Sequence, residues 1–386
     1  MTEDDKQGQT IDNRSLISAY RQSSATEGCI FSPYRICPIG AHIDHQGGAV
    51  LGRTLGIGTK LEYQPLERRE IHIVSKQFGE ASFFIGAEID KTHWARYAQA
   101  AAQVIGDRLK RGMKAHVDGL LVGSGLSSSA SVGLAYLKAL ADVNDIECSN
   151  LELVQMNCRL ENEQLGLQNG ILDPLTIVDG KKDALLLMDM LTATVTPIQD
   201  SPSHNSAWII AYSGVSRELT NSGYNVRVAE CHEAASLLQP GARILSDVSR
   251  ESFDEKKLEL PEHLRRRAAH YFSEVGRARD GAEAWKNASL YHFGQLMNQS
   301  CQSSILNYES GSPILIELHE IASGAKGVYG SRFSGGGYGG CVVALAKQDS
   351  AESTVTEIEE EFKKRHPEFK ASVFVAEMGD GLRVLK

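Results

Sequence analysis

A glycine–serine loop, Gly123-Ser-Gly-Leu-Ser-Ser-Ser-Ala-Ser-Val-Gly133, runs directly into the apolar, helix-length stretch Ser131–Val143. Glycines let a backbone turn tightly and approach a ligand closely. The exposed N–H groups at the start of a helix, aided by the helix dipole, suit a phosphate anion. Serine hydroxyls add further donors and can reach a magnesium ion. The segment therefore predicts a phosphate-binding loop at the start of a helix.

Other kinds of glycine-rich loop fit this segment less well. No Gly-Lys-Ser/Thr follows, as a Walker A loop requires, and the dinucleotide pattern GxGxxG fails at Ser128. A flexible linker or an ordinary serine N-cap is the structural alternative. Linkers seldom lead straight into a strongly apolar helix, so the phosphate-binding interpretation is favoured.

A second glycine-rich segment, Ser334-Gly-Gly-Gly-Tyr-Gly-Gly340, follows Arg332 and precedes a predicted strand, Cys341–Ala346. Five glycines in seven positions let another backbone or a ligand lie close to this strand. Taken alone, the segment fits a mobile loop as well as it fits a phosphate clamp.

A third segment, Pro33-Tyr-Arg-Ile-Cys-Pro-Ile-Gly-Ala-His-Ile-Asp-His-Gln-Gly-Gly48, gathers one arginine, two histidines and an aspartate between Arg35 and His45. This density of hydrogen-bonding groups suits a polyhydroxylated ligand. His42, Asp44 and His45 also resemble half of a metallohydrolase ligand set. The position two before His42 is a glycine, however, so the paired histidine of such a site is missing.

Composition sets the broad class. A chain of 386 residues is longer than one compact core usually holds, which predicts two domains. The net charge of −9 argues against nucleic-acid binding, which needs a basic surface. No apolar run approaches the roughly 20 residues that span a bilayer. Seven scattered cysteines without a CxxC pair favour reduced thiols. We expect a cytoplasmic protein, a monomer or weak dimer, without a membrane partner.

Short apolar runs alternate with amphipathic, helix-length stretches, which predicts a mixed α and β chain. The expected strands are 50–61, 70–75, 184–190, 208–213 and 341–346, and the expected helices include 94–109, 131–143 and 151–165. The polar stretch Gln199–Ser206 reads as a junction. Residues 1–200 and 201–386 are therefore the predicted domains.

In their order along the chain, the three segments resemble the signature motifs of the GHMP kinase family, and most closely those of its galactokinase branch. The resemblance runs from about residue 28 to 345. It implies a two-lobed α+β fold with the active site in the cleft between the lobes. It also implies transfer of a phosphoryl group from ATP to a sugar hydroxyl, with magnesium as the metal ion.

Several residue roles follow from that resemblance. Asp173, in Gly-Ile-Leu-Asp-Pro, falls on the family's catalytic aspartate, although Pro174 replaces the usual glutamine. Arg35 would keep this carboxylate charged and stabilise the transferring phosphoryl group. Ser129 and Glu161 would hold magnesium, with Glu163 as the neighbouring alternative to Glu161. The residues expected to wrap the ATP phosphates are Gly123, Gly125, Leu126, Ser127, Ser128, Ser129 and Ala130. Trp94 would wall the adenine, or else belong to the core.

One departure from the family points to the substrate. Galactokinases have a glutamate that holds the sugar 6-hydroxyl where this chain has Ala41. Its loss removes a partner for galactose and a like-charge clash with a carboxylate at carbon 6, which favours a uronic acid. The expected sugar-binding residues are Arg35, Ala41, His42, Asp44, Asp173 and Tyr224. Arg217 and Arg227 are candidates to meet the substrate carboxylate, with surface ion pairs as the alternative.

The expected reaction is phosphorylation of the anomeric hydroxyl of D-galacturonic acid. The segments 33–48, 166–173, 223–230 and 267–274 most resemble kinases that make galacturonic acid 1-phosphate. A plain galactokinase is the first alternative, followed by an arabinose or glucuronate kinase. A sugar sensor without catalysis and a metallohydrolase are the alternatives from other classes.

Overall fold

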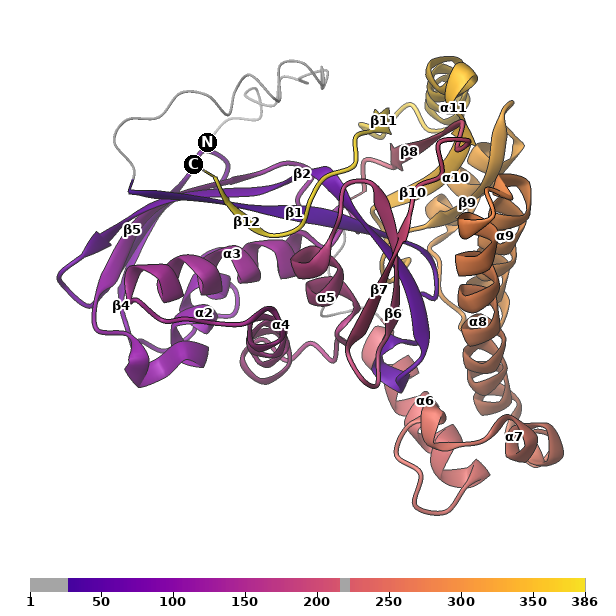
Figure 1. The fold of residues 1–386 in the computed structure, drawn as a ribbon, viewed down its shortest axis with the longest axis horizontal. Helices are drawn as coiled ribbons and strands as arrows, with labels where there is room; N and C mark the ends of the chain where they lie inside the picture. The colour runs from indigo at the N-terminus through magenta and orange to yellow at the C-terminus, as the bar shows by residue number, and fades with distance from the viewer. Residues whose placement is uncertain (1–26, 216–222, 386) are drawn as a thin grey trace.

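The structure, a computed structural model, describes residues 27–215 and 223–385 and contains two β-sheets with helices packed on them (Figure 1). The larger sheet has the strand order β12-β1-β2-β5-β3-β4, with β6 paired to β2 and β7 paired to β6. Its strands are β1 (Gly28–Ile39), β2 (Ala49–Leu66), β3 (Glu70–Ser75), β4 (Gly79–Phe84), β5 (Gly112–Gly119), β6 (Ala184–Asp189), β7 (Thr194–Gln199) and β12 (Arg383–Leu385). All their pairings are antiparallel except that of β3 with β5.

The second sheet has the order β11-β8-β10-β9 and is antiparallel throughout. Its strands are β8 (Ser206–Tyr212), β9 (Val328–Phe333), β10 (Cys341–Lys347) and β11 (Ser372–Ala376). Helices α2 to α5 cover one face of the larger sheet, whereas α9, α10 and α11 pack against the second (Figure 1). The helices are α2 (Arg96–Ile105), α3 (Ser128–Val143), α4 (Asn150–Arg159), α5 (Leu172–Asp179), α6 (Tyr224–Leu238), α7 (Arg250–Lys256), α8 (Glu262–Lys286), α9 (Leu290–Leu306), α10 (Pro313–Gly324) and α11 (Ala351–Arg365).

Three groups of buried apolar side chains hold these layers together. One lies between the larger sheet and α2 to α5 and extends to α6 and α8. The second fills the junction of the two sheets, where Leu51 of β2, Ile210 of β8 and Trp285 of α8 meet. The third lies between the second sheet, α10 and α11. The mixed α and β architecture predicted from sequence is confirmed.

The predicted domain boundary near residue 200 stays a prediction. It falls between β7 of the larger sheet and β8 of the second, where the chain passes from one sheet to the other. Two later parts of the chain, however, pack with the larger sheet. Strand β12 pairs with β1, and side chains of α6 and α8 join the core of the larger sheet.

Most predicted elements lie close to their predicted bounds, and the differences have local causes. The helix predicted from Ser131 begins at Ser128, directly after the left-handed residue Ser127. The helix predicted from Leu151 begins one residue earlier, because Ser149 caps it in a box with Glu152. That helix ends at Arg159 and continues as a π-helical turn. Residues 33–39 of the third sequence motif belong to strand β1, which the sequence did not predict.

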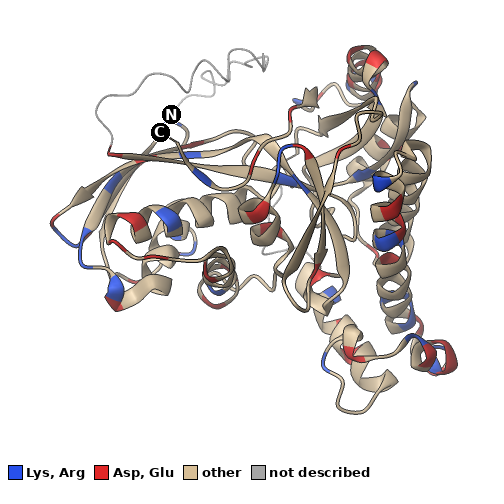
Figure 2. Ribbon diagram, viewed as in Figure 1, with Lys and Arg blue, Asp and Glu red and all other residues tan. Residues whose placement is uncertain are grey.

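Charged residues are distributed over the whole fold. Figure 2 shows Lys and Arg interspersed with Asp and Glu, most densely on α7 and α8. This is not the one-sided basic surface that nucleic-acid binding needs, and the absence of a nucleic-acid partner stays a prediction. Within residues 27–215 and 223–385, no helix is long and apolar enough to cross a membrane.

Candidate active site

A cavity of about 410 Å³ brings the three sequence motifs together. Its walls come from β1 and the turn after it, the serine loop, the first turn of α5, the start of α6 and the glycine-rich loop after β9. The predicted site residues that line it are Arg35, Ala41, His42, Asp44, Trp94, Gly123, Gly125, Ser127, Ser128, Ser129, Asp173 and Tyr224. Segments that are more than 100 residues apart in the sequence therefore form one site.

Arg35 of β1 is the point at which these motifs meet. Its Nε donates a hydrogen bond of 2.7 Å to Oδ1 of Asp173, and its Nη2 lies 2.7 Å from the same oxygen. Its Nη1 donates to the carbonyl of Gly125 and to Oγ of Ser334, each at 3.2 Å. Arg35 is buried, so its charge is neutralised by Asp173 rather than by water. The ion pair holds the arginine rigidly between both loops.

Asp173 lies in the first turn of α5, where its carboxylate faces the cavity. Its second oxygen, Oδ2, accepts a hydrogen bond from Oγ of Ser127. Pro174 follows in the same turn, where a helix needs no backbone N–H donor, so the proline starts this helix without disturbing it. The side chain of Asp173 keeps 19% exposure, which leaves it accessible to a ligand.

The serine loop and the glycine-rich loop contact each other through their backbones. Gly125 has φ +81°, and a Cβ there would lie 2.8 Å from the carbonyl oxygen of Ser334. Gly340 has φ +101°, and a Cβ there would lie 2.3 Å from the carbonyl oxygen of Ser124. Only glycine combines this backbone conformation with so close an approach. The phosphate-binding interpretation is thus favoured over a linker, because the loop is fixed on both sides.

Two residues predicted to contact the nucleotide do not line the cavity. The side chains of Leu126 and Ala130 are fully buried in the apolar cores. The carbonyl of Leu126 accepts a hydrogen bond of 3.1 Å from the backbone N–H of Arg35. Only the backbone groups of these two residues remain available for a phosphate, and their side chains anchor the loop.

Replacing Gly125 by alanine tests the loop. We expect kcat/KM for ATP to fall roughly tenfold or more, because a left-handed alanine costs about 1–2 kcal/mol and its methyl group would displace Ser334. Steady-state kinetics at saturating sugar measure the effect. Gly324→Ala is the matched control, since a Cβ at Gly324 meets nothing within 4 Å. Equal kinetics for both variants would contradict the role of this loop.

The predicted magnesium residues lie on neighbouring elements. Glu161, in the π-helical turn Leu160–Gln164, is 1% exposed and accepts a hydrogen bond of 3.1 Å from the side chain of Asn169. Burial raises the pKa of Tyr97 to about 12; the charge of Glu161 acts in the same direction, and a hydrogen bond with Ser129 opposes it. Helix α2, which carries Tyr97, packs against both α3 and the turn Leu160–Gln164, so Ser129 and Glu161 lie on adjoining elements.

Glu163, the alternative metal residue, points away from this group. Its side chain is 60% exposed and lies 3.7 Å from Nε of Arg159 in a surface ion pair. Among the residues that the structure describes, no cluster of three or more His, Cys, Asp or Glu side chains could hold a metal ion. A metallohydrolase site of His42, Asp44 and His45 is thus not supported. One carboxylate and one hydroxyl suit Mg²⁺, which commonly takes its remaining ligands from phosphates and water.

The turn after β1 carries the predicted sugar-binding residues. Ala41 is buried in the cavity wall, and His42 follows it in the left-handed conformation with φ +67°. The imidazole of His42 stacks on Tyr308, with ring centroids 4.6 Å apart and planes 3° apart. Within the described residues neither ring nitrogen makes a hydrogen bond of good geometry, although the backbone of Gly335 lies near. A buried imidazole without a partner points to a ligand that supplies one.

Electrostatics distinguish the charged groups of this turn. Burial and the charge of Asp173 raise the pKa of Asp44 to about 6, although Arg35 acts in the opposite direction. Burial, followed by the charges of His270 and Arg332, holds the pKa of His42 well below its usual range. His42 is therefore neutral at neutral pH, and Asp44 is ionised.

Sequence reasoning missed several residues of the site. Tyr308 stacks on His42, and its hydroxyl lies 3.0 Å from Nε2 of His45. No sequence pattern linked Tyr308 to the site, because Tyr308 follows α9 and lies more than 260 residues from His42 and His45. Phe78 stacks on Trp94, with centroids 5.9 Å apart, and both line the cavity. The predicted placement of Trp94 at the site is thereby supported, and its partner Phe78 was not foreseen.

One of the two candidate cations for a substrate carboxylate, Arg227, does not line the cavity. Arg227 pairs with Glu230 at 2.7 Å and lies 3.5 Å from Glu309. Arg267 is bound to the same two carboxylates. Arg227 therefore belongs to an ion-pair cluster, and ion pairing was the alternative to a role in binding the substrate carboxylate. Arg217 lies outside the described residues.

The fold has two lobes, and one cavity holds both the fixed glycine–serine loop and the Arg35–Asp173 ion pair. These features together are typical of a small-molecule phosphotransferase. Comparison with known proteins agrees. Residues 96–181 match the model of the GHMP kinases N terminal domain, and residues 282–364 match that of the GHMP kinases C terminal domain. A galacturonokinase of Arabidopsis thaliana is 38% identical over 92% of this chain and 93% of its own length. A galactokinase of Exiguobacterium sibiricum is 32% identical over 92% and 93%.

A solved structure extends the likeness to the fold. The galactokinase of Lactococcus lactis, determined in complex with galactose, superposes with a TM-score of 0.86 over 96% of this chain and 98% of its own, at 28% identity. The chain belongs to the GHMP kinase family. The predicted α+β GHMP kinase fold and the sugar-kinase class are confirmed.

Proposed function

We propose that this kinase transfers the γ-phosphoryl group of ATP to the anomeric hydroxyl of D-galacturonic acid, giving galacturonic acid 1-phosphate and ADP. The observation that carries the choice of sugar is Ala41, which lies in the cavity wall beside His42. A methyl group there leaves room for a carboxylate and neither pairs with a 6-hydroxyl nor repels a negative charge. The similarity to a galacturonokinase supports the same substrate.

Asp173 and Arg35 would carry out the chemistry. A sugar hydroxyl is a weak nucleophile, so a carboxylate that orients it and accepts its proton contributes to the rate. The ion pair with Arg35 and the hydrogen bond from Ser127 hold the carboxylate of Asp173 in a fixed direction. Arg35 also places positive charge beside the serine loop, where the transferring phosphoryl group would lie.

The serine loop would bind the ATP phosphates through its backbone N–H groups and serine hydroxyls. Trp94 and Phe78 would wall the base. Ser129 and Glu161 would hold magnesium, which neutralises charge on the β and γ phosphates when it is bound. The remaining sugar hydroxyls would be bound by His42, Asp44 and Tyr224.

The pH profile should report Asp44. As its pKa is about 6, Asp44 becomes protonated as the pH falls through that value and accepts weaker hydrogen bonds from the sugar hydroxyls. We expect kcat/KM for the sugar to fall about tenfold for each pH unit below roughly 6, while kcat/KM for ATP changes less. A sugar profile that stays flat from about pH 7.5 to 5 would rule out this role of Asp44.

Identification of the product tests the proposed reaction. The enzyme would be incubated with galacturonate, ATP and magnesium, and the product examined by phosphorus NMR. We expect one new phosphate signal coupled to the anomeric proton, together with one ADP for each sugar consumed. A phosphate on another carbon would refute the assignment of the acceptor hydroxyl. Galacturonate binding without any product would instead favour the non-catalytic sensor.

The setting of the enzyme is also a proposal. All seven cysteines are free, which favours a reducing compartment such as the cytoplasm. A monomer or a weak dimer stays our prediction for the oligomeric state, and size-exclusion chromatography with light scattering would check it.

A further inference from the structure

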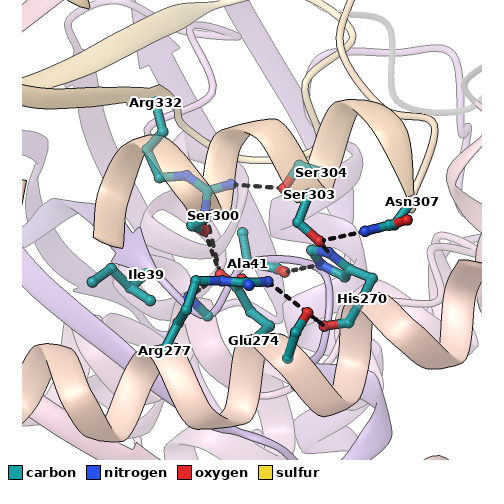
Figure 3. A network of polar contacts seen from close by, with 12 residues as sticks. Ile39, Ala41, His270, Glu274, Arg277, Ser300, Ser303, Ser304, Asn307 and Arg332 are labelled. Carbon is teal, nitrogen blue, oxygen red and sulfur yellow. Dashed lines mark hydrogen bonds and ion pairs between the residues drawn. The ribbon is translucent and has the colours of Figure 1, made fainter. Parts of the chain in front are cut away.

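A buried cluster of charges lies directly behind the turn that carries Ala41 (Figure 3). Oε1 of Glu274, on α8, accepts a hydrogen bond of 2.7 Å from the backbone N–H of Gly40. The same oxygen accepts a hydrogen bond from Ser300 of α9, whose Oγ also accepts one from Arg332 of β9. Nε2 of His270 lies 3.0 Å from the carbonyl oxygen of Ala41. The cluster thus holds the backbone on both sides of Cα of Ala41.

This cluster contains one more positive charge than negative charge. Glu274 is shared by two arginines: Nε of Arg277 lies 2.7 Å from Oε2, and Nη1 of Arg332 lies 3.6 Å from Oε1. Within residues 27–215 and 223–385, neither arginine has another carboxylate within ion-pair distance. Glu274 and Arg332 are fully buried, so water screens the excess charge poorly.

The excess charge acts on the cavity wall. Burial raises the pKa of the Cys37 thiol to about 12; the charges of Arg332 and Arg35 oppose that rise more strongly than Glu274 and Asp44 add to it. Arg332 also contributes to the low pKa of His42, after burial and His270. Cys37 and His42 both line the cavity. Around Asp173 the balance is reversed, since two carboxylates, Asp44 and Asp173, face one arginine. The cavity is therefore more positive at its Ala41 wall than at its Asp173 wall.

We propose that the Glu274–Arg277–Arg332 cluster compensates the carboxylate of the sugar acid through the Ala41 wall, and so determines the preference for a charged substrate. This inference rests on the proposed function. A glutamate at position 41 would supply the missing negative charge, whereas with Ala41 the carboxylate of the substrate supplies it. The polarity also orients the sugar, with its carboxylate toward Ala41 and its anomeric carbon toward Asp173. Arg332 is a positioning and specificity residue, because it does not line the cavity.

Galacturonate and its neutral amide have nearly the same shape but differ in charge. A comparison of their binding therefore separates the effect of charge from the effect of shape. Calorimetry with the full-length enzyme would give the ratio of their dissociation constants. We expect wild-type enzyme to prefer galacturonate, and Arg332→Gln to reduce the ratio about tenfold, as expected for a unit charge acting over about 10 Å at an effective dielectric of about 20. Arg277 lies nearer the surface than Arg332, and Arg277→Gln should also reduce the ratio. Glu274→Gln should increase it.

Arg279→Gln is the control, because it removes an equal charge from the solvent-facing side of the same helix and should leave the ratio unchanged. A merely structural role of the cluster would weaken both ligands equally and keep the ratio constant in all variants, which would overturn the inference. If Arg332→Gln fails to fold, the opposite shifts of Arg277→Gln and Glu274→Gln still decide. A wild-type enzyme that does not prefer galacturonate would refute the proposed function itself.

Discussion

Asp173→Asn should lower kcat by about a thousandfold and leave the dissociation constant of ATP nearly unchanged. The asparagine keeps the shape of the side chain but cannot accept the proton of the sugar hydroxyl, and it no longer neutralises Arg35. The phosphate loop should keep its shape, because its close contacts with the glycine-rich loop do not involve Asp173. Single-turnover kinetics would measure the chemical step, and calorimetry would measure ATP binding.

Asp179→Asn is the matched control for that variant. Asp179 ends the same helix, and its carboxylate accepts a hydrogen bond of 2.6 Å from Asn150 outside the cavity. Its kcat should stay within about twofold of wild type, since surface polar changes usually have small effects. Thermal unfolding of both variants would show whether loss of the Arg35 ion pair destabilises the fold. Near-wild-type turnover by Asp173→Asn in a folded enzyme would remove Asp173 from the mechanism.

Ala41→Glu should reduce kcat/KM for galacturonate by roughly a hundredfold or more. The new carboxylate would face the carboxylate of the substrate in a buried wall, and like charges at such distances cost several kcal/mol. It would also neutralise the excess charge of the Glu274 cluster. The effect should lie mainly in KM for the sugar, because Asp173 and the phosphate loop are not changed. Initial rates over a range of galacturonate concentrations would measure it.

Ala41→Gln separates the charge from the added volume. Glutamine has nearly the same size as glutamate, so steric loss should be equal in the two variants. We expect Ala41→Glu to be about tenfold worse than Ala41→Gln with galacturonate, and the order to reverse with galactose. Equal activities of the two variants with galacturonate would show that position 41 acts through size alone.

Residues of the site that lie in continuous motifs were predictable from sequence. Arg35 and the serine loop lie in short segments with recognisable chemistry, whereas Asp173 was assigned through the family resemblance; residues of all three line one cavity. Glu161 and Glu163 have the same side chain and lie close together in the sequence, so the sequence does not distinguish them as metal ligands. The structure does, because Glu161 is buried and Glu163 is exposed. The contacts of Tyr308 with His42 and of Glu274 with Gly40 gave no local signal, because the two partners of each contact lie more than 200 residues apart.

The same distinction applies to the fold. Strand β3 and helix α3 follow simple apolar patterns, and their predicted positions were close. Strand β1 was missed because its proline, arginine and cysteine residues interrupt alternation, and its irregular pairing with β2 appears only in three dimensions. The return of β12 to β1 depends on a pairing between opposite ends of the chain. No local pattern encodes such a contact.

Release of ADP in parallel assays with galacturonate, glucuronate, galactose and arabinose, each with ATP and magnesium, tests the central claim most directly. We predict that kcat/KM for galacturonate exceeds that for each of the other sugars by at least about tenfold. A preference for galactose would contradict the claim, because it would show that Ala41 does not select for a uronic acid.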